Sequence, residues 1–338
     1  MPGIIEQIAA DLKVSNASVS RALNDRPGVS QDLRERILKR ANELNYTPSL
    51  VARGLATSQT FTLGFFVRHK PDLSAQTDPF YGQVLQGIEQ VLANSDYHVA
   101  IGMLTGEILA APNDFRFVRE RRIDGMMLAG PDIPTEFVLA MLATRVPVVL
   151  VDNKLTHSVT NCVNSDDDAG GYAAARHLID GGHRHIGVIS GPRHWYSSSR
   201  RVRGVQYACA EAGLTPHIVH ADRTTIESGE AATKQLLAEY APVTGLCAVN
   251  DAMALGAIRT ARRANRRVPD DLSVVGFDNI DWAQLNDPAL TTIDIPKRQM
   301  GQEAAKRLLS MLDDTDSSPV EVVVSTQLVV RQSTRTLA

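Results

Sequence analysis

Cysteine is scarce in this chain. Three residues, Cys162, Cys209 and Cys247, stand far apart among 338 residues, and none belongs to a Cys-x-x-Cys pair. An odd number of cysteines at such wide spacing argues against a disulfide framework. We therefore expect three reduced, packed thiols, as is typical of a cytoplasmic protein.

Long apolar stretches are absent as well. No run approaches the ~20 apolar residues that a membrane-spanning helix needs. The first residues also lack the charged and then apolar pattern of a secretory signal. The sequence therefore predicts a cytoplasmic protein that does not associate with a membrane.

Catalytic and cofactor-binding signatures are missing too. No Gly-x-Gly-x-x-Gly or phosphate-loop pattern follows a strand, and no Gly-x-Ser-x-Gly elbow occurs. His183, His185 and Cys162 lack the spacing of zinc ligands. The run Asp166-Asp167-Asp168 resembles a metal site but is better explained as the cap of a helix over residues 169–180. We predict no enzyme activity, no cofactor and no metal.

The charge that is present is unevenly distributed. The chain has a net charge of −3, which by itself argues against a nucleic-acid-binding protein. Residues 1–60, however, hold eight Lys and Arg against six Asp and Glu, so the remainder is more acidic than the whole. A small, slightly basic N-terminal domain on an acidic body fits a DNA-facing headpiece. The length predicts two or three domains.

Residues 5–24 contain two short helical patterns joined by a tight turn. Ser15 suits the N-cap of the second helix, because its hydroxyl can accept a hydrogen bond from a backbone N–H two or three residues later. Two such helices that cross steeply form a helix-turn-helix, whose second helix enters the major groove of DNA. An ordinary helical hairpin is the alternative. The apolar residues at helical spacing are Ile5, Ile8, Ala9 and Leu12, then Val19, Ala22 and Leu23.

The second helix begins with small polar side chains that suit contact with bases. Arg21, one turn further on, can make a bidentate contact with guanine. Lys13 occupies the turn, where a positive φ is expected and where lysine carries a penalty on the order of 1 kcal/mol. The predicted DNA-binding residues of this region are Ser15, Asn16, Ala17, Ser18, Arg21 and Asn24.

A third helix is expected over residues 30–44, with Leu33, Ile37, Leu38 and Ala41 on its inner face. Three motifs in this order make the chain resemble the LacI/GalR family of bacterial transcription repressors. They are Val-Ser-x-x-x-Val-Ser-Arg at residues 14–21, Leu-Asn-Tyr-x-Pro at 44–48 and Val-Ala-Arg-x-Leu at 51–55. The resemblance implies a hinge helix in which Ala52 lets two copies approach and Leu55 wedges into the minor groove.

Strand and helix patterns alternate from residue 61 onward. Short apolar runs, typical of strands buried on both faces, occur at residues 62–67, 97–102, 124–129 and 147–151. A second series lies at residues 186–190, 218–221, 245–249 and 273–277. Alternation of this kind predicts right-handed βαβ units and doubly wound parallel sheets.

The resemblance extends over this whole region and implies a periplasmic-binding-protein-like core of two such subdomains. The fold class expected is thus an all-α helix-turn-helix headpiece joined to an α/β core with a cleft between two doubly wound sheets. The expected boundaries are 1–46 for the headpiece, 47–60 for the hinge helix and linker, and 61–338 for the effector-binding and dimerisation core. Within the core, subdomain 1 would comprise 61–161 and 291–318, and subdomain 2 would comprise 162–290 and 319–338.

Several polar residues are expected where strands end, which is where doubly wound sheets bind small molecules. In the family, the Arg of an Arg-x-x-Gly motif (here Arg201) and the Asp of Gly-[Phe/Tyr]-Asp (here Asp278) contact the effector. Each residue also has a structural alternative, such as an ion pair for Arg201 or a core position for Phe80. The predicted effector-binding residues are Asp78, Phe80, Asp152, Trp195, Ser197, Arg201, Arg223, Asn250 and Asp278.

These observations together predict a repressor that binds double-stranded, pseudo-palindromic operator DNA as a homodimer under control of a small-molecule effector. Carboxylates, an amide and an arginine beside aromatic rings suit a carbohydrate. The absence of a heptad tail after residue 335 favours a dimer over a tetramer. The alternatives are a ligand sensor without specific DNA binding and a sugar-metabolising enzyme.

Overall fold

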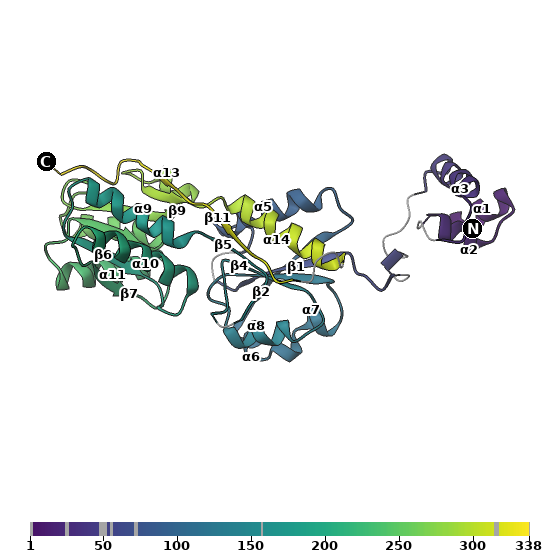
Figure 1. Cartoon of the computed structure of the whole chain (residues 1–338), viewed down its shortest axis with the longest axis horizontal. Helices are drawn as coiled ribbons and strands as arrows, with labels where there is room; N and C mark the ends of the chain where they lie inside the picture. Colours follow the sequence, from purple (N-terminus) through teal and green to yellow (C-terminus); the bar gives the residue numbers. More distant parts are fainter. Residues whose placement is uncertain are drawn as a thin grey trace. The chain divides into compact units, whose positions relative to one another are not determined.

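The computed structural model divides the chain into two compact units, residues 1–61 and 62–338. It describes residues 3–23, 27–46, 53–54, 57–70, 74–156, 158–313 and 318–337. No helix in these ranges is long and apolar enough to cross a membrane. Each unit has a hydrophobic core of its own, and Figure 1 shows the helices and strands that form each unit.

The first unit contains the headpiece, whose helices are α1 (Ile4–Leu12), α2 (Asn16–Leu23) and α3 (Gln31–Glu43). Their inner faces bury Ile8, Ala9, Val19, Ala22, Ile37 and Ala41. Arg40 of α3 donates from Nε to Asp11 of α1 at 2.8 Å, which ties the third helix to the first.

One residue predicted for this inner face lies elsewhere. Leu38 is 46% exposed, whereas its neighbour Ile37 is fully buried. Successive residues of an α-helix are about 100° apart around the axis, so both cannot face the same narrow core.

The second unit, the core, contains two α/β sheets, as predicted, and each sheet has six strands. The first sheet is parallel throughout, in the order β11-β5-β4-β3-β1-β2. Its strands are β1 (Thr62–Arg68), β2 (His98–Leu104), β3 (Gly125–Ala129), β4 (Val148–Val151), β5 (Cys162–Ser165) and β11 (Glu321–Val324).

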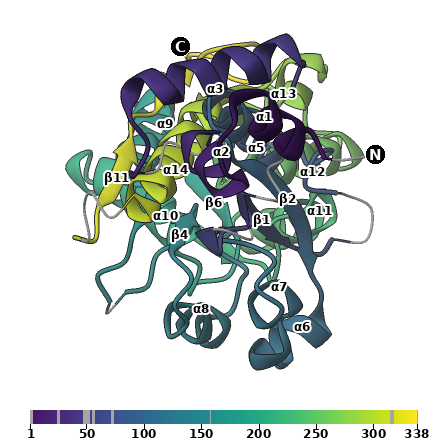
Figure 2. The ribbon, with the colours of Figure 1, turned by 90° about the vertical axis from the view of Figure 1, so that its right-hand side faces the viewer.

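Helices cover both faces of the first sheet, which explains its continuous apolar strands. In Figures 1 and 2, α5 (Tyr81–Leu92) and α14 (Lys297–Leu312) lie on one face. The opposite face carries α6 (Gly106–Ala110), α7 (Arg116–Arg119) and α8 (Thr135–Leu142). Within β1, Phe65 faces the first group of helices and Phe66 faces Phe115 and Phe137 on the second side.

The second sheet has the order β12-β10-β9-β8-β6-β7 and is parallel except for β12, which runs antiparallel to β10. Its strands are β6 (Ile186–Ser190), β7 (His217–His220), β8 (Gly245–Ala248), β9 (Ser273–Asp278), β10 (Thr291–Asp294) and β12 (Gln327–Val329). The accompanying helices are α9 (Asp167–Asp180), α10 (Tyr196–Glu211), α11 (Ile226–Glu239), α12 (Asp251–Arg263) and α13 (Asp281–Leu285).

The chain crosses between the sheets at other points than the sequence predicted. We expected 162–290 and 319–338 in subdomain 2, but β5 and β11 pair within the first sheet. We expected 291–318 in subdomain 1, but β10 pairs with β9 of the second sheet. The reason is geometric: every crossing leaves from the carboxyl end of a strand, so the whole strand belongs to the sheet before the crossing. The three crossings therefore follow Ser165, Asp294 and Val324.

Candidate functional site

The turn between α1 and α2 adopts the geometry that the sequence predicted. Lys13 has a φ of 55° and a ψ of 44°, in the left-handed region. The Ser15 hydroxyl accepts a hydrogen bond from the Ser18 backbone N–H at 3.0 Å, which caps the start of α2. Ser15 and Ser18 also join through their hydroxyls at 2.9 Å.

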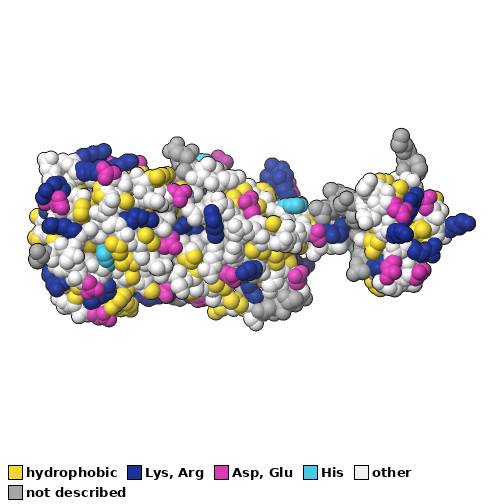
Figure 3. Space-filling view, turned by 90° about the horizontal axis from the view of Figure 1, so that it is seen from above, with side chains coloured by type: hydrophobic (Ala, Val, Ile, Leu, Met, Phe, Trp, Pro, Cys, Tyr) yellow, Lys and Arg dark blue, Asp and Glu magenta, His cyan; other side chains and the backbone are white. Residues whose placement is uncertain are grey.

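The exposed start of α2 presents the side chains proposed to contact DNA. Asn16, Ala17 and Arg21 are exposed, while Ser18 is half-buried and engaged with the capping serine. Basic and acidic side chains are interspersed on the headpiece surface shown in Figure 3. Three other predicted DNA-binding residues, Asn24, Ala52 and Leu55, lie outside the described residues.

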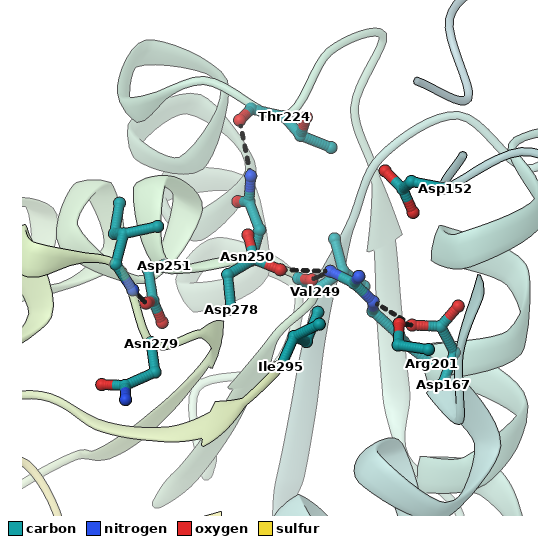
Figure 4. Close-up of polar contacts among 12 residues, drawn as sticks. Asp152, Asp167, Arg201, Thr224, Val249, Asn250, Asp251, Asp278, Asn279 and Ile295 are labelled. Atoms are coloured by element: carbon teal, nitrogen blue, oxygen red, sulfur yellow. Dashed lines mark hydrogen bonds and ion pairs between the residues drawn. The ribbon is translucent and has the colours of Figure 1, made fainter. Parts of the chain in front are cut away.

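Arg201 organises a polar cluster in the core at the carboxyl ends of the strands (Figure 4). Its Nε donates to Asp167 Oδ1 at 2.8 Å, and its Nη1 donates to the Val249 carbonyl at 2.7 Å and to Asp278 Oδ1 at 2.9 Å. The guanidinium also lies 4.0 Å from the centroid of the Phe277 ring. Among the described residues, none accepts a hydrogen bond from Nη2, so this nitrogen can serve a ligand.

The carboxylates around Arg201 are held in a low-dielectric setting. Burial raises the pKa of Asp278 to about 6, although Arg201 and Lys297 oppose the shift. Asp152, which directly follows β4, is 8% exposed and accepts a hydrogen bond from the Tyr81 hydroxyl at 3.0 Å. Burial raises the pKa of Asp152 to about 8, against the attraction of Arg201 and with the repulsion of Asp167 and Asp278. Asp152 of the first sheet thus faces the cluster of the second.

The three consecutive aspartates have three separate roles. Asp166 caps α9, as predicted, by accepting a hydrogen bond from the Ala169 N–H at 3.1 Å. Asp167 is the buried partner of Arg201, and Asp168 pairs with Arg200 and Arg203 on the neighbouring helix. Over the described part of the chain, no group of three or more His, Cys, Asp or Glu is placed to hold a metal ion.

Two predicted effector residues have structural contacts that occupy them. Asp78 accepts hydrogen bonds from the N–H groups of Phe80 and Tyr81, at 2.9 and 3.0 Å, and pairs with Lys70 at 2.9 Å. Phe80 lies in the hydrophobic core and packs edge-on against Tyr81 at 5.1 Å between ring centroids. These contacts support a core position for Phe80 and give Asp78 a capping role, and an effector role for either residue stays a prediction.

The remaining predicted residues lie at helix starts and in a loop of the second sheet. Asn250 caps α12 by accepting from the Met253 N–H at 2.9 Å and donates to the Thr224 carbonyl at 3.0 Å. Trp195 immediately precedes α10 and is half-buried, and Ser197 is buried in the first turn of that helix. Arg223 is exposed in the loop after β7.

Sequence reasoning missed Tyr81, Asp167 and Lys297 as residues of this site, whereas Asp251, beside Asn250, stood among the polar groups expected at strand ends. Asp251 is fully buried: it accepts from the Thr292 hydroxyl at 2.5 Å and the Ile280 N–H at 2.9 Å, and burial raises its pKa to about 8. A signal existed for Asp167, because it is the middle residue of an acidic run at a predicted helix start. The sequence predicts a helix start at Tyr81 but places the later helix from about residue 299, and only the fold supplies the partners of Tyr81 and Lys297.

The chain is similar in sequence to known regulatory proteins over almost its whole length. Residues 4–49 match the family described as bacterial regulatory proteins, lacI family, and residues 175–334 match the periplasmic binding protein-like domain. The transcriptional repressor PurR of Photobacterium profundum is 32% identical over 338 residues, covering 98% of this chain and 99% of the relative. The repressor CytR of Escherichia coli (strain K12) is 32% identical over 335 residues, with coverage of 98% and 96%.

Solved structures show the same arrangement of elements. The lac repressor dimer bound to operator and the anti-inducer ONPF has a TM-score of 0.79 at 27% identity, covering 99% of this chain and all of that one. The transcriptional regulator CelR in complex with cellobiose has a TM-score of 0.75 at 28% identity, with coverage of 98% and 100%. Because sequence and fold agree along almost the full length, the chain belongs to the LacI family of bacterial regulatory proteins.

Proposed function

We propose that this protein represses transcription by binding a pseudo-palindromic operator as a homodimer, and that a small-molecule effector controls its affinity for the operator. It would act in the cytoplasm, where the DNA is. The relatives named as repressors and the lac repressor dimer on its operator support the DNA-binding part. The observation that carries the effector part is the buried Arg201 cluster, in which no described residue accepts a hydrogen bond from Nη2.

The headpiece would read the major groove with the exposed start of α2. Asn16 and Arg21 are the side chains long and polar enough to reach base edges, and Ala17 can contact a thymine methyl. Ser15 and Ser18 would act mainly by fixing the start of the helix, because they are hydrogen-bonded to each other. Asn24 would extend the contact toward the backbone phosphates.

The hinge would form on the operator. By analogy with the family motif at residues 51–55, Ala52 would let the two hinge helices approach, and the paired Leu55 side chains would enter the central minor-groove step. Such a wedge unstacks a base step at a cost of a few kcal/mol and bends the DNA onto more protein surface.

The charges of the core cluster favour a neutral, hydroxyl-rich effector. Arg201 is already flanked by Asp167 and Asp278, and Asp152 adds a third carboxyl, so the cluster has no surplus positive charge for an anionic ligand. Carboxylates and a guanidinium together bind hydroxyl groups well, because they accept and donate hydrogen bonds respectively. Among similar structures, CelR is in complex with cellobiose and a LacI family regulator of Enterococcus faecium has bound ribose. A carbohydrate is therefore our proposed effector class.

Binding in the core would change operator affinity through relative motion of the two subdomains. The chain crosses between the sheets three times, which provides a hinge of the kind that closes on ligands. Coupling between two such sites is typically 1–3 kcal/mol.

Two experiments test the proposal separately. A selection from random DNA sites should yield a two-fold symmetric consensus; a protein that selects no consensus would instead be a ligand sensor without specific DNA binding. A thermal-shift screen of neutral sugars, sugar acids and nucleobases should find stabilisation by a neutral sugar. Stabilisation by a sugar acid, with none by neutral sugars, would refute the proposed effector class. Turnover of a stabilising sugar would indicate an enzyme.

A further inference from the structure

Lys297, the first residue of α14, is a buried cation that none of the proposed functions has used. It is 3% exposed, and its ammonium donates to the carbonyl oxygens of Asp278, Asn279 and Ile295 at 2.5, 3.2 and 3.1 Å. An ammonium has three donors, so all three are engaged. The nearest carboxylate oxygen in an ion pair, Asp294 Oδ1, is 3.8 Å away.

The carbonyls that Lys297 holds belong to a strained turn of the effector site. Asp278 and Asn279 have φ values of 108° and 51°, in a region that residues other than glycine rarely adopt. Asn279 donates to Asp294 Oδ1 at 2.8 Å and accepts from Arg331 at 2.7 Å. Since Asp278 is also the partner of Arg201, the contacts that fix this turn also fix the effector-site carboxylate.

Lys297 also belongs to the other half of the core. The helix that it begins, α14, lies on the first sheet and packs closely along α5. A Cβ atom on Gly87 of α5 would overlap the Arg298 carbonyl, and one on Gly301 would overlap the Val84 carbonyl. Hydrogen bonds from Arg298 to Gln86 at 3.1 Å and from Gln302 to Gln90 at 2.8 Å add to this contact. The two helices must therefore move together.

Helix α5 in turn contacts the effector site, on the side formed by the first sheet. The first residue of α5 is Tyr81, whose hydroxyl donates to Asp152 at 3.0 Å. Lys297 and α14–α5 thus connect Asp278 of the second sheet to Asp152 of the first. Both carboxyls flank Arg201, one by a hydrogen bond and one by charge.

We propose that Lys297 is a positioning residue that couples the effector-site turn Asp278–Asn279 to α14 and α5, so that a change at Asp278 is transmitted to the first subdomain. That this coupling takes part in repression rests on the proposed function. A lysine that only filled space would lower stability when removed but would not transmit a change at Asp278.

Hydrogen exchange in the full chain distinguishes these roles without operator or effector. Asp278→Asn serves as the perturbation, because it weakens the pair with Arg201 at nearly constant size. In the wild-type background we expect it to speed exchange in the first turns of α14 and α5 by about fivefold, the lower end of typical coupling between sites. In the Lys297→Met background we expect the same perturbation to leave the first turn of α14 unchanged and to have a smaller effect on α5, which it can still reach through Asp152 and Tyr81.

The control is Lys306→Met, on the same helix, where Lys306 is 57% exposed and pairs with Glu303. It should leave the effect of Asp278→Asn unchanged. Should Lys297→Met fail to fold, Lys297→Gln replaces it, since it keeps amide donors but cannot reach all three carbonyls. An effect of Asp278→Asn on α14 and α5 that is equal with and without Lys297 would overturn the proposal. A failed operator selection would refute the proposed function and leave this coupling standing.

Discussion

The Arg201 guanidinium and the Asp278 carboxylate form an ion pair with 2.9 Å between Nη1 and Oδ1, and their side chains are only 8% and 12% exposed. One cation serves two buried carboxylates, because Asp167 binds the Nε side of the same group. Burial of an ion pair stabilises a fold only when the remaining polar atoms are satisfied. The Val249 carbonyl and the Phe277 ring also contact the arginine, whereas Asp167 Oδ2 is buried without a hydrogen-bond partner among the described residues.

Removal of this arginine should destabilise the core strongly. Arg201→Met leaves Asp167 and Asp278 buried without their cation, and breaking a buried pair in this way costs about 3–5 kcal/mol. Arg200→Met is the matched control, because the Arg200 side chain is 30% exposed and its pair with Asp168 should contribute less than about 1 kcal/mol. Urea unfolding of the two variants measures both values. Equal losses would show that Arg201 is not the centre of the cluster.

The stability of the core should depend on pH through Asp152. Its pKa is about 8 in the folded protein, against ~4 for an unfolded aspartate. The folded state thus holds a proton that the unfolded state releases, and the stability that this provides is complete below about pH 4 and lost as the pH rises through 8. Burial also raises the pKa of Asp251 to about 8 and the pKa of Asp278 to about 6. Both groups therefore contribute stability that is lost as the pH rises.

Asp152→Asn should remove one of these contributions and keep an acceptor for the Tyr81 hydroxyl. Unfolding measured from pH 5 to pH 9 should show a smaller loss for the variant than for the wild type. Asp222→Asn, at an exposed loop position, is the control and should follow the wild type. Parallel curves for wild type and Asp152→Asn would contradict the predicted role of the Asp152 proton.

The headpiece offers a stabilising substitution. Lys13 has a φ of 55°, a conformation that costs a residue with a Cβ about 1 kcal/mol and glycine far less. Lys13→Gly should therefore slow hydrogen exchange of α1 and α2 by about fivefold to tenfold, since 1.4 kcal/mol corresponds to a factor of ten. Lys13→Ala retains the Cβ and should bring no gain. A gain shared by both variants would point to lost charge and not to backbone strain.

The sequence predicted the local features of the headpiece well because they depend on neighbours in the chain. The Ser15 cap, the left-handed Lys13 and the buried face of Val19 and Ala22 all follow from residue type and spacing. The prediction that Leu38 is buried was wrong, because residue spacing alone does not show how wide the buried face of a helix is.

The core was harder to predict where contacts join distant segments. Strand β5 lacks a long apolar run, because it contains Asn164 and Ser165. Nothing in the sequence indicates that β11, 159 residues later, pairs with it. The same limit applies to Lys297, whose carbonyl partners lie up to 19 residues away on another sheet. Asp78 and Phe80 were predicted as effector residues from the family resemblance alone, and the sequence did not reveal the local capping and packing contacts that they make.

Arg21 should contribute to operator binding without contributing to the fold. It is exposed on α2, so Arg21→Ala should leave headpiece exchange unchanged. If Arg21 contacts guanine, the loss should be about 1–3 kcal/mol in binding the selected operator, with relaxed preference at one base pair. Ser15→Ala is the contrasting variant: loss of the cap should destabilise α2 by about 1 kcal/mol. A uniform loss across all DNA sequences would reassign Arg21 to a phosphate contact.

Leu55 is the residue that the proposed hinge would insert into the operator. If paired Leu55 side chains enter the minor groove at the centre of the operator, Leu55→Ala loses the contacts that offset a few kcal/mol of unstacking. Specific binding should then weaken far more than non-specific binding, which depends on phosphate charge. Leu139→Ala, at a 47% exposed position on α8, is the control and should change neither affinity. Gel-shift titrations at matched salt measure both affinities, and equal losses of specific and non-specific binding would rule out the wedge.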